Sequence, residues 1–216
     1  MTSEILLPLF PLPNLVFFPG TRMPLHIFEP RYRQLVGDVL AGDSRFGIIL
    51  PKPGWEADYY GTPPLHLYGT LGTIEHSVTL DDGRFNILVH GDVRFRLVGL
   101  VSDSPYRVAR VVEDPERVGN ETDAVAERER LAELSRQYLE YLPDQMEVPE
   151  LGTASLGALT NALIMSLGID VEAKQRLLEV GDMIDRSRQT GAELERRIES
   201  LRFLKPFRKD FDPSRN

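Results

Sequence analysis

The sequence predicts an α+β fold in which a closed or nearly closed antiparallel β-barrel with one short helix is followed by a C-terminal α-helical subdomain. Up to about residue 115, short apolar runs rich in β-branched residues alternate with Gly, Pro and Asp, as strands and turns do. Beyond that point apolar residues recur three and four positions apart, which is the spacing of one helix face. We therefore divide the chain into a β-barrel domain, residues 1–115, and a helical subdomain, residues 116–216.

About seven strands are predicted in the first part. Pro30 opens the one expected helix, because its fixed φ suits a first helical turn, and an apolar stripe follows it. The run Asp81-Asp82-Gly83 is typical of a hairpin turn, since glycine tolerates positive φ. Such a set of strands favours closure into a barrel, which removes exposed strand edges. The predicted strands are Ile5–Leu9, Met23–Phe28, Phe46–Leu50, Thr70–Leu80, Arg84–Val89, Val93–Val101 and Tyr106–Val112.

Four helices are predicted in the second part. Asn120 is a good N-cap for the first, Pro143 ends it, and Asp170 caps the third. The second ends at Gly168, which suits the left-handed position after a helix. Small residues on the last helix would let another backbone come close. The residues expected on the packed face are, for the first helix, Leu131, Leu134, Tyr138 and Tyr141; for the second, Leu156, Leu159, Leu163 and Leu167; and for the last, Ile184, Ser187, Gly191, Leu194, Ile198 and Leu201.

Composition excludes several classes of protein. The net charge of −8 argues against a general nucleic-acid binder, because Lys and Arg supply most of the affinity for phosphate. The absence of cysteine excludes disulfides, iron–sulfur clusters and cysteine nucleophiles. No basic residue precedes the apolar start, and Pro8, Pro11 and Pro13 interrupt it, so we expect neither a secretory signal nor a membrane span. The cytoplasm is the simplest location.

Common catalytic motifs are absent from the sequence. There is no G-x-x-x-x-G-K-[ST] phosphate loop, no H-E-x-x-H and no G-x-S-x-G. The pair Asp81-Asp82 is better explained as turn chemistry than as an acid–base pair. We therefore predict no catalytic, cofactor or metal site, with an uncharacterised hydrolase as one alternative. The four histidines lie singly in the sequence and favour structural roles: His26, His66, His76 and His90.

Two segments carry residues typical of binding surfaces. Residues 51–68 place the only tryptophan, Trp55, near Tyr59 and Tyr60 in a connection rich in Pro and Gly, and such rings are frequent interface anchors. The alternative is that these rings fold back over the barrel. Residues 202–209, RFLKPFRK, form a basic segment that could touch nucleic acid or anionic lipid, but a frayed helix end whose cations complement the helix dipole is the simpler interpretation.

The opening stretch carries a specific resemblance. LPLFPLPNLVFFPGTRMPLHIFEPRYRQLV, residues 7–36, strongly resembles the start of the Lon protease N-terminal domain, the substrate-binding module of that ATP-dependent machine. Further similarities follow in the expected order at Tyr68-Gly69-Thr70, at residues 82–100 and at residues 170–199. The resemblance therefore covers nearly the whole chain.

The resemblance implies a PUA-like antiparallel β pseudo-barrel followed by a helical subdomain. Residues 14–20 would then form an ordered loop in which Phe17 and Phe18 either plug the barrel or form an apolar surface. The junction that contains His26, Glu29, Arg31 and Tyr32 would be structural. In it, Arg31 would pair with a carboxylate and Tyr32 would pack under the helix.

The resemblance also implies a function. A full Lon protease continues into an ATPase module and a protease domain, and the sequence contains neither. We expect a stand-alone, non-catalytic module that recognises polypeptide, either unfolded segments or a partner protein such as a proteolytic machine. A nucleic-acid-binding PUA-like protein is the second alternative. The candidate polypeptide-binding residues are Phe17, Phe18, Trp55, Tyr59 and Tyr60.

Overall fold

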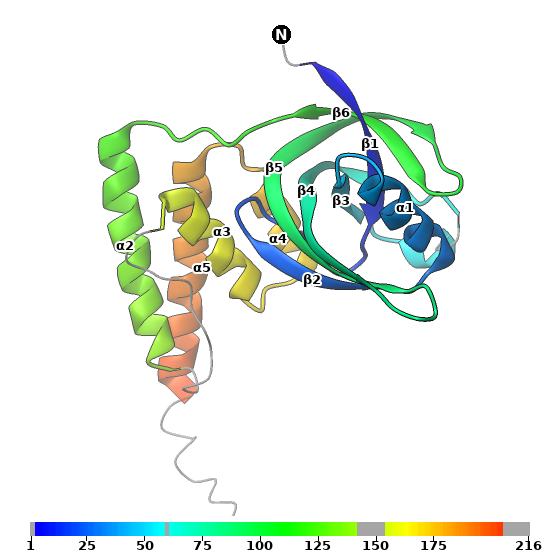
Figure 1. The fold of residues 1–216 in the computed structure, drawn as a ribbon. Coiled ribbons are helices and arrows are strands. Elements are labelled where there is room, and N and C mark those ends of the chain that lie inside the picture. The colour runs from blue at the N-terminus through cyan, green and yellow to red at the C-terminus, as the bar shows by residue number, and fades with distance from the viewer. Residues whose placement is uncertain (1–2, 59–60, 142–153, 205–216) are drawn as a thin grey trace, which may run out of the picture.

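A barrel of strands lies beside a group of helices (Figure 1). The computed structural model describes residues 3–58, 61–141 and 154–204. Within these ranges the elements in chain order are β1 (Glu4–Pro11), β2 (Arg22–Ile27), α1 (Pro30–Leu40), β3 (Arg45–Pro51), the short 3-10 helix η1 (Trp55–Asp58), β4 (Leu65–Thr79), β5 (Phe85–Ser102), β6 (Arg107–Glu113), α2 (Glu121–Leu139), α3 (Leu156–Ser166), α4 (Val171–Glu179) and α5 (Met183–Leu204).

The sheet closes on itself, as the sequence predicts. Strand β6 pairs with β1 on one side and with the C-terminal half of β5 on the other, so β1, β3, β4, β5 and β6 form a ring. Strand β2 pairs with the N-terminal half of β5. The long β5 therefore belongs to the ring at one end and to a three-stranded extension, β2-β5-β4, at the other.

One pairing differs from the predicted antiparallel arrangement. Strands β1 and β3 run parallel, with Leu9 opposite Gly47 and Pro11 opposite Ile49. Parallel neighbours need a long connection, and β2 together with α1 supplies it. The sheet is therefore mixed, and the expectation of a wholly antiparallel barrel is wrong at this pair.

The two strands predicted at 84–89 and 93–101 are one continuous strand, β5. Gly91, which lies between the two predicted strands, is paired with Gly72. A Cβ atom at position 91 would lie only 2.5 Å from the carbonyl oxygen of Phe18. Glycine is therefore required there for the close approach of the loop at residues 12–20, which we call the proline loop. In the described residues the sheet has six strands rather than about seven.

Local signals predict several boundaries correctly. Helix α1 begins at Pro30, and the turn at Gly83 has a φ of 78°. The Asn120 side chain accepts a hydrogen bond from the backbone N–H of Thr122 at 2.8 Å, which confirms it as the N-cap of α2. Asp170 caps α4 in the same way.

The predicted left-handed cap at Gly168 is wrong. Helix α3 ends at Ser166, Leu167 follows in an extended conformation, and the φ of Gly168 is not positive. At the helix end the Leu167 N–H donates to the Leu163 carbonyl at 2.9 Å, and beyond it the Gly168 carbonyl accepts a hydrogen bond from Arg197 Nη2 at 2.7 Å. The predicted stop at Pro143 lies outside the described residues.

Helix α5 lies against α2, and its small residues make room for side chains of α2 rather than for its backbone. A Cβ atom at Gly191 would lie 2.7 Å from Arg130 Nη1. The hydroxyl of Ser187 lies 3.3 Å from Glu127 Oε1. The small residues on one face of α5 were predicted to admit another backbone, but they accommodate side chains of α2 instead.

The proline loop joins the barrel to the helices. Phe17, 1% exposed, belongs to the barrel core, which also contains Phe46 and Val89. Phe18, fully buried, packs on the other side with Ile164 of α3 and Leu178 of α4. The two adjacent rings therefore fix one loop to both parts of the chain.

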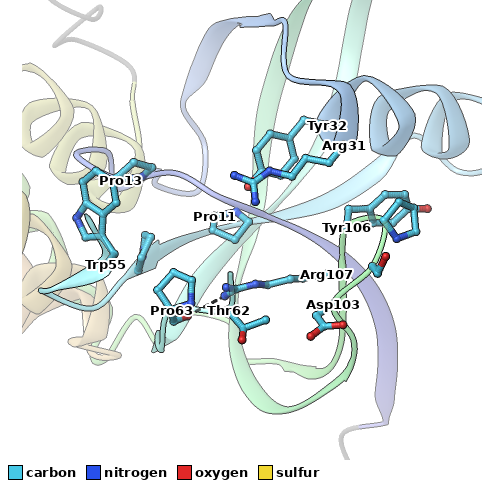
Figure 2. Close-up of a pocket in the computed structure, with 13 residues that line it drawn as sticks. Pro11, Pro13, Arg31, Tyr32, Trp55, Thr62, Pro63, Asp103, Tyr106 and Arg107 are labelled. Atoms are coloured by element: carbon cyan, nitrogen blue, oxygen red, sulfur yellow. Dashed lines mark hydrogen bonds between the residues drawn. The ribbon is translucent and has the colours of Figure 1, made fainter. Parts of the chain in front are cut away.

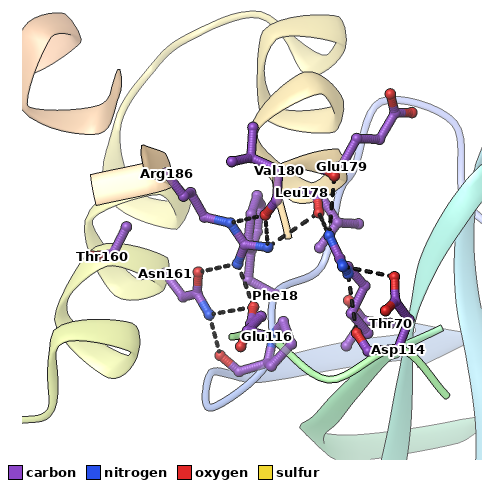
Figure 3. Close-up of polar contacts among 12 residues, drawn as sticks. Phe18, Thr70, Asp114, Glu116, Thr160, Asn161, Leu178, Glu179, Val180 and Arg186 are labelled. Carbon is purple, nitrogen blue, oxygen red and sulfur yellow. Dashed lines mark hydrogen bonds and ion pairs between the residues drawn. The ribbon is translucent and has the colours of Figure 1, made fainter. Parts of the chain in front are cut away.

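A buried arginine completes this junction (Figure 3). Arg186 of α5 has no exposed surface and forms an ion pair with Glu116 in the connection between β6 and α2. It also donates to Asn161 Oδ1 at 2.9 Å and to the Val180 carbonyl at 2.7 Å. Burial lowers the pKa of Arg186, and the Glu116 carboxylate opposes that effect. The guanidinium thus links α3, α4 and α5 to the connection.

Arg94 of β5 contacts the same end of α4, at Leu178 and Glu179, which Figure 3 labels. Its guanidinium pairs with Asp114 at 2.7 Å and donates to the carbonyls of Leu178 and Glu179 at 3.0 and 3.1 Å. The last carbonyls of a helix lack partners within the helix and carry its negative dipole end, so cationic donors stabilise them. Two arginines from opposite sides therefore fix α4 in place.

Candidate functional site

A cavity of about 350 Å³ lies where four connections of the barrel meet (Figure 2). Its walls come from the end of β1, the first turn of α1, the segment between β3 and β4, and the connection between β5 and β6. Closure of the barrel brings these segments together, although they span residues 11 to 107 of the chain.

The cavity is lined mainly by rings. Trp55 and Tyr106 lie on opposite sides of it with Pro11 between them, and Tyr32 lies above (Figure 2). Proline rings are apolar, have no backbone N–H and restrict the chain, so they form a stiff wall. The prolines that line the cavity are Pro11, Pro13, Pro51, Pro63 and Pro105.

Two arginines support the walls. Arg107 is 6% exposed and donates to the carbonyls of Pro63, at 2.9 Å, and Gly61, at 3.2 Å. It therefore ties β6 to the segment that precedes β4. Arg31 donates to Glu29 Oε2 at 3.1 Å and lies over the ring of Tyr32, 4.7 Å from its centroid.

Two further contacts position the rings. The hydroxyl of Tyr106 donates to Asp38 Oδ2 at 2.8 Å, and burial together with this carboxylate raises the pKa of Tyr106. Tyr32 is 7% exposed and packs against Phe10, with ring centroids 4.3 Å apart. The expected pairing of Arg31 with a carboxylate and the expected packing of Tyr32 under α1 are both confirmed.

The predicted site residues have different positions. Trp55, half-buried, lines the cavity. Tyr59 and Tyr60 lie outside the described residues. Phe17 and Phe18 are buried in two separate clusters, so the alternative in which they form an apolar surface is wrong, and a partner cannot reach them in this structure. A hydrogen bond also fixes the backbone at this position, because the Phe17 carbonyl accepts from the Thr70 hydroxyl at 2.6 Å.

Sequence reasoning missed Tyr106 and Arg107. The signal was present as Ser104-Pro105-Tyr106, a proline and an aromatic residue in a short connection between strands, but Tyr106 was predicted only as the start of a strand. The basic segment at 202–209 lies largely beyond the described residues, which end at Leu204. Within them, Arg202 Nε donates to the Tyr141 hydroxyl at 3.1 Å.

The arrangement provides surfaces for binding. In the part of the chain that the structure describes, no group of three or more His, Asp or Glu side chains is placed to hold a metal ion. None of the helices described has the length and apolar character needed to cross a bilayer. The ring-lined cavity combines aromatic and proline rings with polar and charged side chains, among them Arg31, Asp103 and Arg107, so it can offer both ring contacts and hydrogen-bonding groups to a ligand.

Comparisons with known proteins agree with this architecture. The chain is 31% identical over 205 residues to Lon protease 2 of Myxococcus xanthus, and 32% identical over 203 residues to the Lon protease of Trichlorobacter lovleyi. Each match covers 91% of this chain and 24% of the relative, so the chain spans about a quarter of the length of these relatives.

Two solved structures share the fold. A Lon N-terminal domain protein from Xanthomonas campestris has a TM-score of 0.63 and 26% identity, and the match covers 87% of this chain and 98% of that one. The N-terminal domain of a Mycobacterium avium complex Lon protease has the same TM-score with 18% identity, over 88% and 98% of the two chains. The family model for the substrate-binding domain of ATP-dependent protease La (LON) matches residues 6–196. The chain therefore belongs to the family of LON substrate-binding domains.

Proposed function

We propose that this protein is a non-catalytic module that binds polypeptide, either unfolded segments or exposed segments of a partner protein, in the cytoplasm. One observation carries the proposal: in a member of the LON substrate-binding family, Trp55 and Tyr106 lie on opposite sides of a proline-lined cavity. Tryptophan and tyrosine are frequent anchors of interfaces because they offer large contact area at low conformational cost.

The chemistry of the cavity supports polypeptide as the ligand. An apolar side chain that enters the cavity gains contact with the rings, while backbone groups of an extended segment meet polar atoms such as the Arg31 guanidinium and the Asp103 carboxylate at the edge. Nucleic acid is disfavoured by the net charge of −8.

The test is binding of a labelled, permanently unfolded model protein to the full chain, measured by fluorescence anisotropy. Trp55→Ala and Tyr106→Ala should each weaken binding by about 1 kcal/mol or more, which is roughly fivefold in Kd. Phe28→Ala is the matched control, because this ring is 60% exposed and lies outside the cavity. Wild-type affinity in both cavity variants would refute the cavity as the site.

Absence of catalysis is part of the proposal. The purified protein should neither hydrolyse ATP nor cleave an unfolded protein, because the sequence contains no phosphate loop and no assignable nucleophile with its base. Turnover that disappears on a point substitution within this chain would contradict it.

We also propose the division into a barrel domain, residues 1–115, and a helical subdomain, residues 116–216. Limited proteolysis should first cut the connection at 115–121 or the segment at 51–64, because ordered paired strands resist cleavage. A first cut at the hairpin around Asp82 would show that the boundary is misplaced.

A further inference from the structure

A second hollow, of about 560 Å³, separates the barrel from the helices. We call it the junction groove. The end of the proline loop forms one side of it, and the first turns of α2 and α3 form the other. It shares no lining residue with the ring-lined cavity.

The floor of the junction groove is apolar. Ala124, Leu156 and Met183 line it and belong to one buried cluster. Valines at the rim remain in contact with solvent, since Val118 is 57% exposed and Val125 is 51% exposed. Apolar side chains around a concave floor are typical of a surface that a partner covers.

The rim carries negative charge. Asp92 of β5 and Glu121 of α2 both line the groove, one from the barrel and one from the helices. Glu116 also lines it, but this carboxylate is compensated by Arg186. Arg128 is the cation of the lining, and its Nε donates to the Ala154 carbonyl at 2.7 Å. This bond orients the guanidinium without cancelling its charge, so the lining keeps one net negative charge once Asp92 and Glu121 are counted. Two carboxylates on opposite sides of an apolar floor favour a cationic ligand that also has apolar surface.

We propose that the junction groove binds a short polypeptide segment in which an aliphatic or aromatic side chain stands next to Lys or Arg. The apolar side chain covers the Leu156 and Met183 floor, and the cation lies between Asp92 and Glu121. The inference rests on the proposed function for the class of ligand, and it adds a second site with its own charge preference. The ring-lined cavity has a different balance of charge, because two arginines, Arg31 and Arg107, lie in its lining with one carboxylate, Asp103.

The test compares two fluorescein-labelled decapeptides that differ only in two positions, Arg in one and Glu in the other, within the same Leu- and Ala-containing sequence. Binding to the full chain is measured by anisotropy at low and at physiological salt. The Arg peptide should bind at least about tenfold more tightly at low salt, and the ratio should fall as salt screens the rim. Equal binding of the two peptides, or a preference for the Glu peptide, would overturn the inference.

Variants locate the site. Asp92→Asn with Glu121→Gln should reduce the preference for the Arg peptide to about twofold or less, while Glu129→Gln, an exposed carboxylate on the same helix and outside the groove, should leave it unchanged. Val118→Ser should weaken the binding of both peptides severalfold. Val78→Ser, with 59% exposure and no place in the groove, is its matched control.

Two outcomes separate this inference from the proposed function. If Trp55→Ala removes binding of the unfolded model protein but leaves the Arg peptide bound, the groove is an independent site and the inference is supported. If Trp55→Ala removes binding of the Arg peptide while the groove variants bind it normally, the peptide occupies the cavity, and the inference fails although the proposed function stands. If neither the unfolded protein nor the peptides bind the wild-type chain, both fail. Thermal melts of every variant serve as the control for an intact fold.

Discussion

Arg186→Met should destabilise the protein strongly. The guanidinium has no exposed surface and fills the junction between the barrel and the helices. Methionine replaces much of its apolar length but none of its donors. Glu116 would keep only the Asn161 amide, at 3.3 Å, and the Val180 carbonyl would lose both of its bonds to Arg186. The Leu178 carbonyl would retain Arg94.

The size of the effect follows from this inventory. Removing one partner of a buried ion pair costs about 3–5 kcal/mol, because the other charge is left without compensation. The Glu116 side chain is 16% exposed, so water can reach it, and we expect the lower end of the range, about 3 kcal/mol. For a chain of about 200 residues, each kcal/mol lowers Tm by roughly 2–4 °C, which gives a decrease of about 6–12 °C.

Thermal and urea denaturation followed by far-UV circular dichroism measure the effect. Arg188→Met is the control on the same helix, because this side chain is 59% exposed and its pairing with Asp185 at 3.6 Å is a surface contact. Adding Glu116→Gln to Arg186→Met removes the uncompensated charge and should recover part of the loss. If Arg186→Met lowers Tm no more than Arg188→Met does, the buried arginine does not hold the junction together and the reasoning is wrong.

Gly91→Ala should cost about 1–3 kcal/mol in urea denaturation, because the added methyl would lie 2.5 Å from the Phe18 carbonyl oxygen. Gly37→Ala, within α1 and with nothing inside 4 Å of the new methyl, should instead stabilise by about 0.5–1 kcal/mol; the same sign for both would contradict the packing argument. Tyr106 should titrate above the ordinary value of about 10 in NMR, because burial and Asp38 raise its pKa, so its contribution to stability is complete below about pH 10 and is lost as pH rises through the folded pKa. Asp38→Asn should lower this pKa, and no change would show that burial alone sets it.

Local signals in the sequence predicted local structure. The helix from Pro30, the turn at Gly83 and the caps at Asn120 and Asp170 each depend on residues within one turn of the feature, and all four appear in the structure. The left-handed cap at Gly168 failed because the chain leaves α3 through Leu167 in an extended conformation, and the Leu167 N–H donates to the Leu163 carbonyl.

Features that depend on distant contacts were not predictable in this way. The parallel pairing of β1 depends on its neighbour β3, and the continuity of β5 depends on its pairing with β4. The burial of Phe18 requires α3 and α4, which begin more than a hundred residues later. An aromatic pair beside a proline has the same sequence signature whether it lies in a core or on a surface, so exposure could not be inferred from it.

The residues of the candidate site also differ in whether local sequence or distant contacts reveal them. Trp55 could be found because a single tryptophan in a Pro- and Gly-rich segment is conspicuous without any knowledge of the fold. Tyr106 and Arg107 acquire their significance only when the barrel closes and brings their connection opposite the segment that carries Trp55.

Phe17 and Phe18 were predicted as candidate contacts for a polypeptide, but in the structure they anchor the proline loop. Pro13, near its start, lines the ring-lined cavity, and Pro19 and Gly20, at its end, line the junction groove. Between them, Phe17 is held in the barrel core and Phe18 against the helices. Because buried aromatic rings resist displacement, a loop fixed at two adjacent positions cannot adjust one wall without straining the other. The buried rings therefore do not contact a partner themselves; they fix one wall of the proposed cavity site and one wall of the proposed groove site in the same loop.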